Sequence, residues 1–272
     1  MKTEIKRIEK EFHDRQGYHY EQRWVAQPRF KHHYSRIARH IKFYLRRKNG
    51  IRLVDVGCGT GRGALFFAET HNHIVGLDIS LSLLKIFRNK IRSKRLNNFD
   101  LILCDVENPP LREEIADLIT FFGTLHHLPN KNKALYEATH LLQLEGIISV
   151  HEPNREAYRI PWIIGSSLSN LRTILKPKAN MISTNDESED ISPYESSLTL
   201  TELKDWLLRQ GLEILEAKTV WFLGIIPFKL PLAIAEFYYC VANVIDGLLE
   251  KPGLYGNKAG AVHIIAKAPS RN

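Results

Sequence analysis

A glycine-rich segment near residue 55 carries the clearest chemical signal in the sequence. Gly57, Gly59 and Gly61 follow the apolar stretch Ile51–Val56, and Asp78 ends the next apolar stretch about 20 residues on. Glycines permit a tight turn and a close approach of the backbone to a ligand. A carboxylate at the end of the second strand can accept hydrogen bonds from both hydroxyls of a ribose. The spacing therefore predicts a site for a cofactor that contains a nucleoside.

Histidines follow two later apolar segments. His126 and His127 come after the stretch Ala116–Phe122, and His151 lies at the end of a further apolar stretch. Ligands of open α/β sheets lie beyond the C-terminal ends of the strands, so these imidazoles should share one rim. Imidazole titrates near neutral pH and could deprotonate a hydroxyl or an acidic carbon, although each ring could instead only stabilise a loop. His127, His151 and His126 are therefore the candidate catalytic residues.

A scaffold of alternating strands and helices is needed to position these residues. The periodicity predicts strands at Ile51–Val56, His73–Asp78, Phe99–Val106, Ala116–Phe122, Gly146–Glu152, Glu213–Phe222 and Ala261–Lys267. It predicts helices at Phe30–Lys48, Gly63–Thr70, Leu81–Leu96, Lys131–Leu144, Thr199–Gln210 and Leu230–Leu249. Strands that alternate with helices of about ten or more residues indicate parallel βαβ units. The fold class is therefore α/β, with a doubly wound sheet.

The glycine segment belongs to a series of motifs that resembles one family. Asp55 followed by Gly57-Cys58-Gly59-Thr60-Gly61 resembles the first signature of class I S-adenosylmethionine (SAM)-dependent methyltransferases, an acid followed by G-x-G-x-G. Segments similar to the later family motifs follow in order: Gly76–Ser80, Cys104–Val106, Ala116–Phe122 and His126–Pro129. The resemblance covers residues 50–154 and is closest to the branch that acts on small molecules and lipids. It implies a Rossmann-like, seven-stranded, mostly parallel sheet with helices on both faces, a reversed C-terminal hairpin and helical caps or insertions.

The resemblance also implies a cofactor and a reaction. SAM would donate its methyl group by direct displacement to an O or C atom of a small apolar or lipid-like acceptor, and S-adenosylhomocysteine would be the product. Ile79 would lie against the adenine, and Asp105 with the N–H of Val106 would bind its edge. In this family an aromatic residue of the N-terminal cap often covers the cofactor, and His13, Tyr18 and Tyr20 are the candidates. The expected cofactor-binding residues are Asp55, Gly57, Cys58, Gly59, Gly61, Asp78, Ile79, Asp105, Val106 and Phe122.

Three other functions remain open on the sequence alone. In a shifted register, Gly59-x-Gly61-x-x-Ala64 fits the fingerprint of an NAD(P)-dependent dehydrogenase, although its pyrophosphate would lie unfavourably close to Asp55. Residues 1–50 hold fourteen Lys and Arg against five Asp and Glu, which allows an RNA or other nucleic-acid methyltransferase. Such a basic run is more often a solvated face, so nucleic acid is the less expected partner. A module that binds SAM without catalysis is the third alternative.

The chain length of 272 residues suits one large α/β domain with insertions. We expect a basic helical cap at 1–49, a SAM-binding core at 50–154, a partly mobile insertion over the acceptor at 155–197, and the rest of the core at 198–272 with an apolar helical insertion at 225–258. The sequence does not specify the oligomeric state.

The sequence also bears on membrane contact and cellular compartment. The apolar stretch Leu230–Leu249 approaches the length that spans a bilayer, but Glu236, Asn243 and Asp246 interrupt it. A packed helix, or one in peripheral contact with a membrane surface, is therefore expected. Three scattered cysteines and a charged start without an apolar leader predict a cytoplasmic protein without disulfides, and no metal is expected.

Overall fold

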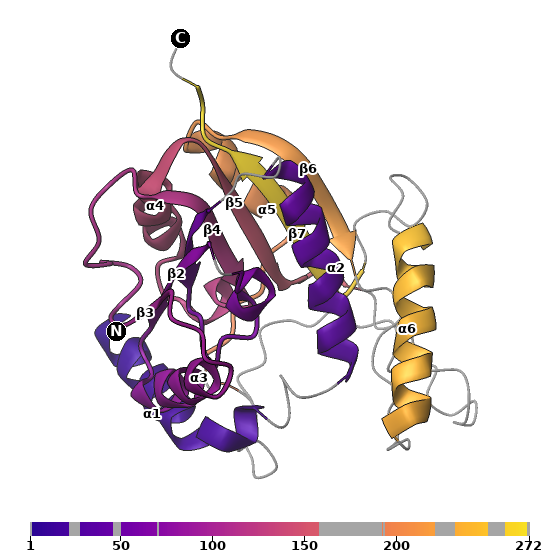
Figure 1. The fold of residues 1–272 in the computed structure, drawn as a ribbon. Helices are drawn as coiled ribbons and strands as arrows, with labels where there is room; N and C mark the ends of the chain where they lie inside the picture. Colours follow the sequence, from indigo (N-terminus) through magenta and orange to yellow (C-terminus); the bar gives the residue numbers. More distant parts are fainter. Residues whose placement is uncertain are drawn as a thin grey trace, which may run out of the picture.

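Seven strands form a single sheet in the order β3-β2-β1-β4-β5-β7-β6 (Figure 1). The computed structural model describes residues 2–21, 28–45, 50–69, 71–157, 192, 194–220, 232–249 and 259–270. The strands are β1 (Arg52–Val56), β2 (His73–Asp78), β3 (Phe99–Leu103), β4 (Ala116–Phe122), β5 (Leu142–Pro153), β6 (Glu213–Val220) and β7 (Ala261–Lys267). Strands β1 to β5 pair in parallel, whereas β7 is antiparallel to both β5 and β6. The expected doubly wound sheet with a reversed C-terminal hairpin is thus confirmed.

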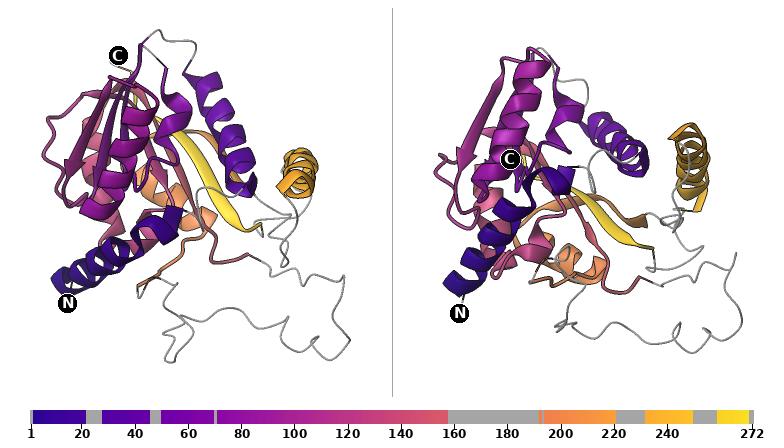
Figure 2. Two further views of the ribbon diagram at one scale, coloured as in Figure 1. Left: turned by 60° about the horizontal axis from the view of Figure 1, so that its bottom comes forward. Right: turned by 90° about the horizontal axis from the view of Figure 1, so that it is seen from below.

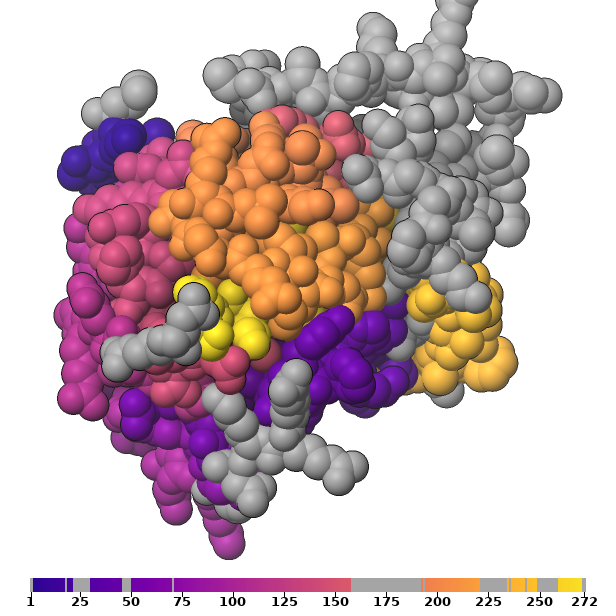
Figure 3. All heavy atoms as spheres, turned by 90° about the horizontal axis from the view of Figure 1, so that it is seen from above, coloured from indigo at the N-terminus to yellow at the C-terminus, as the bar shows by residue number. Residues whose placement is uncertain are grey.

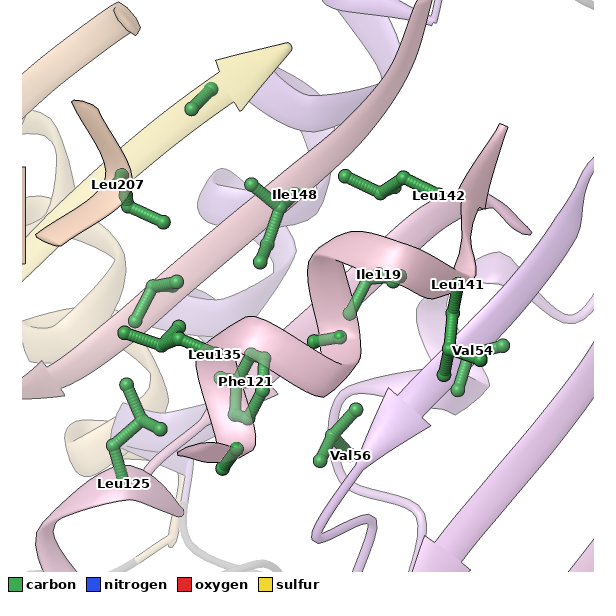
Figure 4. Close-up of a cluster of buried hydrophobic side chains, with 14 of the residues drawn as sticks. Val54, Val56, Ile119, Phe121, Leu125, Leu135, Leu141, Leu142, Ile148 and Leu207 are labelled. Atoms are coloured by element: carbon green, nitrogen blue, oxygen red, sulfur yellow. The ribbon is translucent and has the colours of Figure 1, made fainter. Parts of the chain in front are cut away.

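Helices cover both faces of this sheet. They are α1 (Lys2–Tyr20), α2 (Pro28–Tyr44), α3 (Leu81–Ser93), α4 (Lys131–Leu141), α5 (Leu200–Arg209) and α6 (Leu232–Leu249). Successive strand residues point to opposite faces, so Val54 belongs to one hydrophobic core and its neighbour Leu53 to the other. The core around Val54 contains residues of α4 and α5 (Figure 4). The core around Leu53 contains residues of α2 and α3.

Helix α1 and helix α6 lie outside these two layers. Helix α1 contacts α3, where the Asp14 carboxylate accepts hydrogen bonds from the Ser80 hydroxyl and the Ser82 N–H. Helix α6 contacts α2 at the edge of the molecule, and both views of Figure 2 show it away from the sheet. No described helix has both the length and the apolar character needed to cross a bilayer.

Several predicted boundaries differ from the structure. The helix expected at Gly63–Thr70 is only a short 3₁₀ turn at Ala64–Phe67. The strand expected to reach Val106 ends at Leu103, because the Asp105 carboxylate accepts the N–H of Glu107 and so turns the chain. These differences shorten elements without changing their order.

The junction of α4 and β5 also differs from the prediction. The helix expected to reach Leu144 ends at Leu141, and β5 begins at Leu142 rather than Gly146. Glu145 adopts a φ of +59°, and the pairing with β4 shifts register between Leu142 and Ile147, around this residue. A local turn within β5 therefore replaces the last turn of the predicted helix. The capping box that the sequence predicts at Thr199 is confirmed, with reciprocal bonds between Thr199 and Glu202.

Parts of the predicted organisation lie outside the described residues. They include 22–27 in the basic cap, 46–49 at the end of the predicted helix Phe30–Lys48, and residue 70 at the end of the predicted helix Gly63–Thr70. They also include 158–191 and 193 in the insertion, 221–222 at the end of the predicted strand Glu213–Phe222, and 225–231 and 250–258 around α6. The division of the chain at these positions stays a prediction.

Candidate active site

The glycine loop bends across the end of β2 and places N–H groups around Asp78. Gly57 and Cys58 both donate their N–H to the Leu77 carbonyl, at 2.8 and 2.9 Å. The Asp78 carboxylate accepts the N–H of Gly59 at 2.7 Å and that of Ser80 at 2.8 Å. Burial raises the pKa of Asp78 above its ordinary value, and these two N–H groups oppose the rise. Asp78 thus forms a fixed hydrogen-bond acceptor at the strand end.

Two glycines of the loop have distinct roles that single substitutions can separate. Both have positive φ, +69° at Gly57 and +53° at Gly59. A Cβ at Gly57 would lie 2.2 Å from Thr124 Cγ2, whereas a Cβ at Gly59 would meet nothing closer than 3.9 Å. Gly57 is therefore required for packing, and Gly59 leaves open space against which a ligand can lie.

We therefore predict that Gly57→Ala lowers the free energy of unfolding by about 2–4 kcal/mol, from backbone strain and overpacking together. Gly59→Ala is the matched control, which should cost only about 1–2 kcal/mol of stability but should weaken SAM binding. Urea denaturation and calorimetric titration measure the two effects. Equal stability losses in the two variants would contradict the assignment.

A small cavity of about 80 Å³ adjoins the loop and Asp78. Six of the predicted cofactor-binding residues line it: Gly57, Gly59, Asp78, Ile79, Asp105 and Val106. Helix α1 contributes Lys6, Glu9, His13 and Tyr20 to the same lining. The open side of Gly59, the carboxylate of Asp78 and the apolar flanks of Ile79 and Val106 fit the nucleoside of SAM.

The other four predicted residues, Asp55, Cys58, Gly61 and Phe122, do not line this cavity. Asp55 accepts the Thr120 hydroxyl at 2.6 Å, and burial raises its pKa to about 6. A Cβ on Gly61 would lie 2.2 Å from the Phe87 ring, and Cys58 Sγ lies close to Gly76. Phe122 contacts the Tyr34 ring, with centroids 5.5 Å apart. These residues support the loop, and their contact with cofactor stays a prediction.

A second cavity, of about 280 Å³, lies beside the first. Eight of its lining residues carry an aromatic or imidazole ring: Phe12, His13, Tyr20, Phe30, Tyr34, His126, His127 and His151. The other lining residues include the polar or charged side chains of Gln16, Arg62, Ser192 and Glu195. The Arg62 guanidinium lies 4.6 Å from the centre of the Tyr34 ring. Four residues line both cavities, namely His13, Tyr20, Gly123 and His127. These four therefore form a wall shared by the two cavities.

The three predicted histidines lie together at the rim but in different surroundings. His126 Nδ1 lies 2.7 Å from a Glu152 carboxylate oxygen, and the other oxygen of Glu152 accepts the N–H groups of Thr124 and Leu125. His126 thus fixes the loop after β4. Nε2 of His151 lies 3.1 Å from Nε2 of His33. Burial, followed by the nearby Arg62, lowers the pKa of His151 to about 3, so its ring is neutral at pH 7.

His127 is the predicted histidine that lines both cavities. Its Nδ1 lies 3.2 Å from a Glu9 carboxylate oxygen and 3.1 Å from the Ser192 hydroxyl. Burial, followed by the neighbouring His126, lowers the pKa of His127 to about 4, although the bond to Glu9 opposes this. Because a carboxylate can only accept, Nδ1 carries the proton of the neutral ring and Nε2 is left as the basic atom.

Helix α1 contributes two charged residues to the site that the sequence analysis did not identify, Lys6 and Glu9. Lys6 Nζ lies 2.6 Å from Asp105 Oδ2 and 2.7 Å from Glu107 Oε2. Partial burial would raise the pKa of Asp105, but the bond from Lys6, the N–H of Glu107 and the charge of Lys6 together keep this pKa below its ordinary value. Glu9 was also missed, although its spacing of four residues from His13 places both on one helix face. The ligand atoms of Glu9, His13 and His127 lie within 4.8 Å of one another, so this group could also hold a cation.

Comparison with known proteins identifies the family. A family model described as "Methyltransferase domain" matches residues 47–207. An uncharacterized protein of Methanocaldococcus jannaschii is 30% identical over 190 residues, which are 68% of this chain and 70% of that protein. A demethylmenaquinone methyltransferase of Listeria welshimeri is 29% identical over 116 residues, 40% of this chain, and the match spans 49% of that enzyme. A ubiquinone/menaquinone biosynthesis C-methyltransferase of Campylobacter jejuni is 26% identical over 64% of this chain and 76% of its own length.

Solved structures show the same fold at lower identity. A SAM-dependent methyltransferase of Thermotoga maritima has a TM-score of 0.58 and 19% identity, covering 95% of this chain and 99% of its own. The [4+2]-cyclase SpnF has a TM-score of 0.55 and 19% identity, covering 87% of this chain and 82% of its own. The match to the methyltransferase family model excludes the NAD(P)-dependent dehydrogenase, which was compatible with the glycine loop alone. The chain belongs to the class I SAM-dependent methyltransferases and is an enzyme whose cofactor is SAM.

Proposed function

We propose that this enzyme methylates an O or C atom of a small aromatic acceptor of the quinone-precursor kind, bound in the larger cavity. The observation that carries the proposal is the wall of His13, Tyr20, Gly123 and His127 shared by the two cavities. Where these residues border both cavities, the methyl group of SAM in the smaller cavity can lie in direct contact with an acceptor in the larger one. Proximity of this kind is the main requirement of a direct displacement.

The lining of the larger cavity supports an aromatic acceptor. Phe12, Phe30 and Tyr34 offer apolar surface and ring faces, and planar rings stack well on such surfaces. Relatives named as demethylmenaquinone and ubiquinone/menaquinone methyltransferases support the same class, although the match to the former spans about half of those proteins.

Different residues of the chain bind the cofactor, orient the acceptor and accept a proton. SAM, when bound, supplies an electrophilic methyl group on a positively charged sulfur. Asp78 and the glycine loop hold its nucleoside, and the aromatic residues of α1 and α2 orient the acceptor and exclude water. Nε2 of His127 accepts the proton when the acceptor arrives protonated, and the Glu9 carboxylate stabilises the imidazolium that results.

Transfer of label from methyl-labelled SAM tests the proposal. A short-chain demethylmenaquinol should become methylated, whereas tRNA and duplex DNA should remain unlabelled. Tight SAM binding without transfer to any of a panel of quinols and phenols would contradict the proposed acceptor class. Label in RNA or DNA would favour the nucleic-acid alternative, and no turnover with any acceptor would favour a non-catalytic module.

A further inference from the structure

Helix α6 presents an apolar face away from the protein. Its exposed large apolar residues are Ile234, Phe237, Val241, Val244, Ile245 and Leu248. At 100° per residue these six positions fall within an arc of about 100°, which is one continuous stripe. The side chains of Phe237 and Val244 are 73% and 62% exposed. We call these six residues the α6 stripe.

The two acidic residues of the same helix, Glu236 and Asp246, face the protein. Glu236 Oε2 lies 2.6 Å from His32 Nε2 on α2, and Glu236 Oε1 lies 3.7 Å from Lys31 Nζ. Asp246 is buried, and a Cβ at Gly247 would lie 3.7 Å from the Arg36 guanidinium. A surface helix of a globular protein normally turns its apolar side inward and its charges outward. Helix α6 has the reverse orientation, and an apolar stripe left in water indicates a surface that binds another apolar surface.

Charge near the stripe indicates what covers it. Helix α2, which lies beside α6 in Figures 1 and 3, exposes Lys31, Arg39 and Lys42, together with Phe43 at 77% exposure. Lys42 also pairs with Glu69. The sequence of α2 holds five Lys and Arg and no Asp or Glu. An apolar helix face flanked by basic residues is the combination that binds an anionic bilayer surface.

We propose that the α6 stripe and the exposed side of α2 form a docking surface for an anionic lipid bilayer, with α6 lying in the plane of the interface. A second copy of the chain fits less well, because pairing two such surfaces would bring like charges together. This docking is independent of the acceptor. If the proposed function also holds, docking brings the larger cavity near the bilayer, since α2 contributes Phe30 and Tyr34 to its lining.

Vesicle sedimentation tests the docking surface with the full-length protein. The protein should pellet with vesicles of phosphatidylglycerol and phosphatidylcholine, and less with phosphatidylcholine alone or at high salt. The double variant F237D/V244D should lower the partition coefficient at least about tenfold, because it places two charges in the apolar interface. Leu208→Asp is the matched control, since Leu208 is an exposed apolar residue on α5 and its variant should bind like the wild type.

Two further measurements keep the outcomes distinct. SAM affinity in solution should be the same for wild type, double variant and control, which shows that all three are folded. Sedimentation equilibrium should give a monomer for all three. No pelleting of the wild type, or equal pelleting of the double variant, would overturn the proposal. A wild-type dimer that F237D/V244D converts to monomer would instead assign the α6 stripe to self-association.

Discussion

Replacing Asp78 by alanine should weaken SAM binding by about 2–3 kcal/mol, or roughly 30- to 150-fold in the dissociation constant. A charged acceptor at the end of β2 is expected to bind both ribose hydroxyls, and the variant loses these bonds. It also releases the N–H groups of Gly59 and Ser80, which the carboxylate holds at 2.7 and 2.8 Å. The glycine loop therefore loses an anchor together with the ligand contact.

Asp100→Ala provides the matched control for this measurement. Asp100 is an exposed acid on the neighbouring strand β3, where its carboxylate lies 2.9 Å from His73 Nε2. Isothermal titration with SAM and with S-adenosylhomocysteine should give near-wild-type affinity for Asp100→Ala. A near-wild-type affinity for Asp78→Ala would contradict the cofactor site described above.

Replacing His127 by glutamine should lower kcat about 10²- to 10⁴-fold and change SAM affinity little. Glutamine can still donate a hydrogen bond to Glu9, so it preserves the loop while removing the basic Nε2. The appropriate readout is a single-turnover rate with an acceptor identified by the labelling experiment. His140→Gln is the control and should keep the wild-type rate, because His140 is half-buried on α4 and lines neither cavity.

The pH profile gives a second test of the same residue. With a pKa of about 4, His127 is neutral above that pH and loses its basic form only as the pH falls through about 4. The wild-type rate should therefore show no decline due to this group between pH 8 and pH 5. A decline of the wild-type rate near pH 6.5 that is absent in His127→Gln would show that His127 titrates like an ordinary imidazole. That result would contradict the lowered pKa of His127. A kcat within threefold of wild type in His127→Gln would exclude proton transfer to Nε2.

Much of the fold follows from local pattern, because each buried strand is an apolar run closed by a turn signal. Strands β2, β4 and β7 have the predicted bounds. The predictions were less accurate where tertiary contacts outweigh local preference. Leu142 is helical by pattern, but its pairing with Ala116 draws it into β5. The residues after Gly63 begin a helical repeat but form only a 3₁₀ turn.

The sequence predicted those site residues that lie at the ends of strands. Asp78, the glycines and the three histidines are fixed by the topology of a parallel sheet, whose C-terminal strand ends share one edge. The contribution of α1 was harder to predict, because helical periodicity shows which face of a helix is apolar and not where the helix docks. Lys6 and Glu9 meet Asp105 and His127 across about a hundred residues of sequence or more, and no local signal specifies such contacts.

The most direct test of the account is a crystal structure with S-adenosylhomocysteine bound. Methyl transfer requires that SAM and the acceptor meet directly where the two cavities adjoin, at His13, Tyr20, Gly123 and His127. The ribose should lie on Asp78, and the sulfur should face these four residues and the larger cavity. A ligand bound elsewhere, or a sulfur directed away from the larger cavity, would contradict this arrangement.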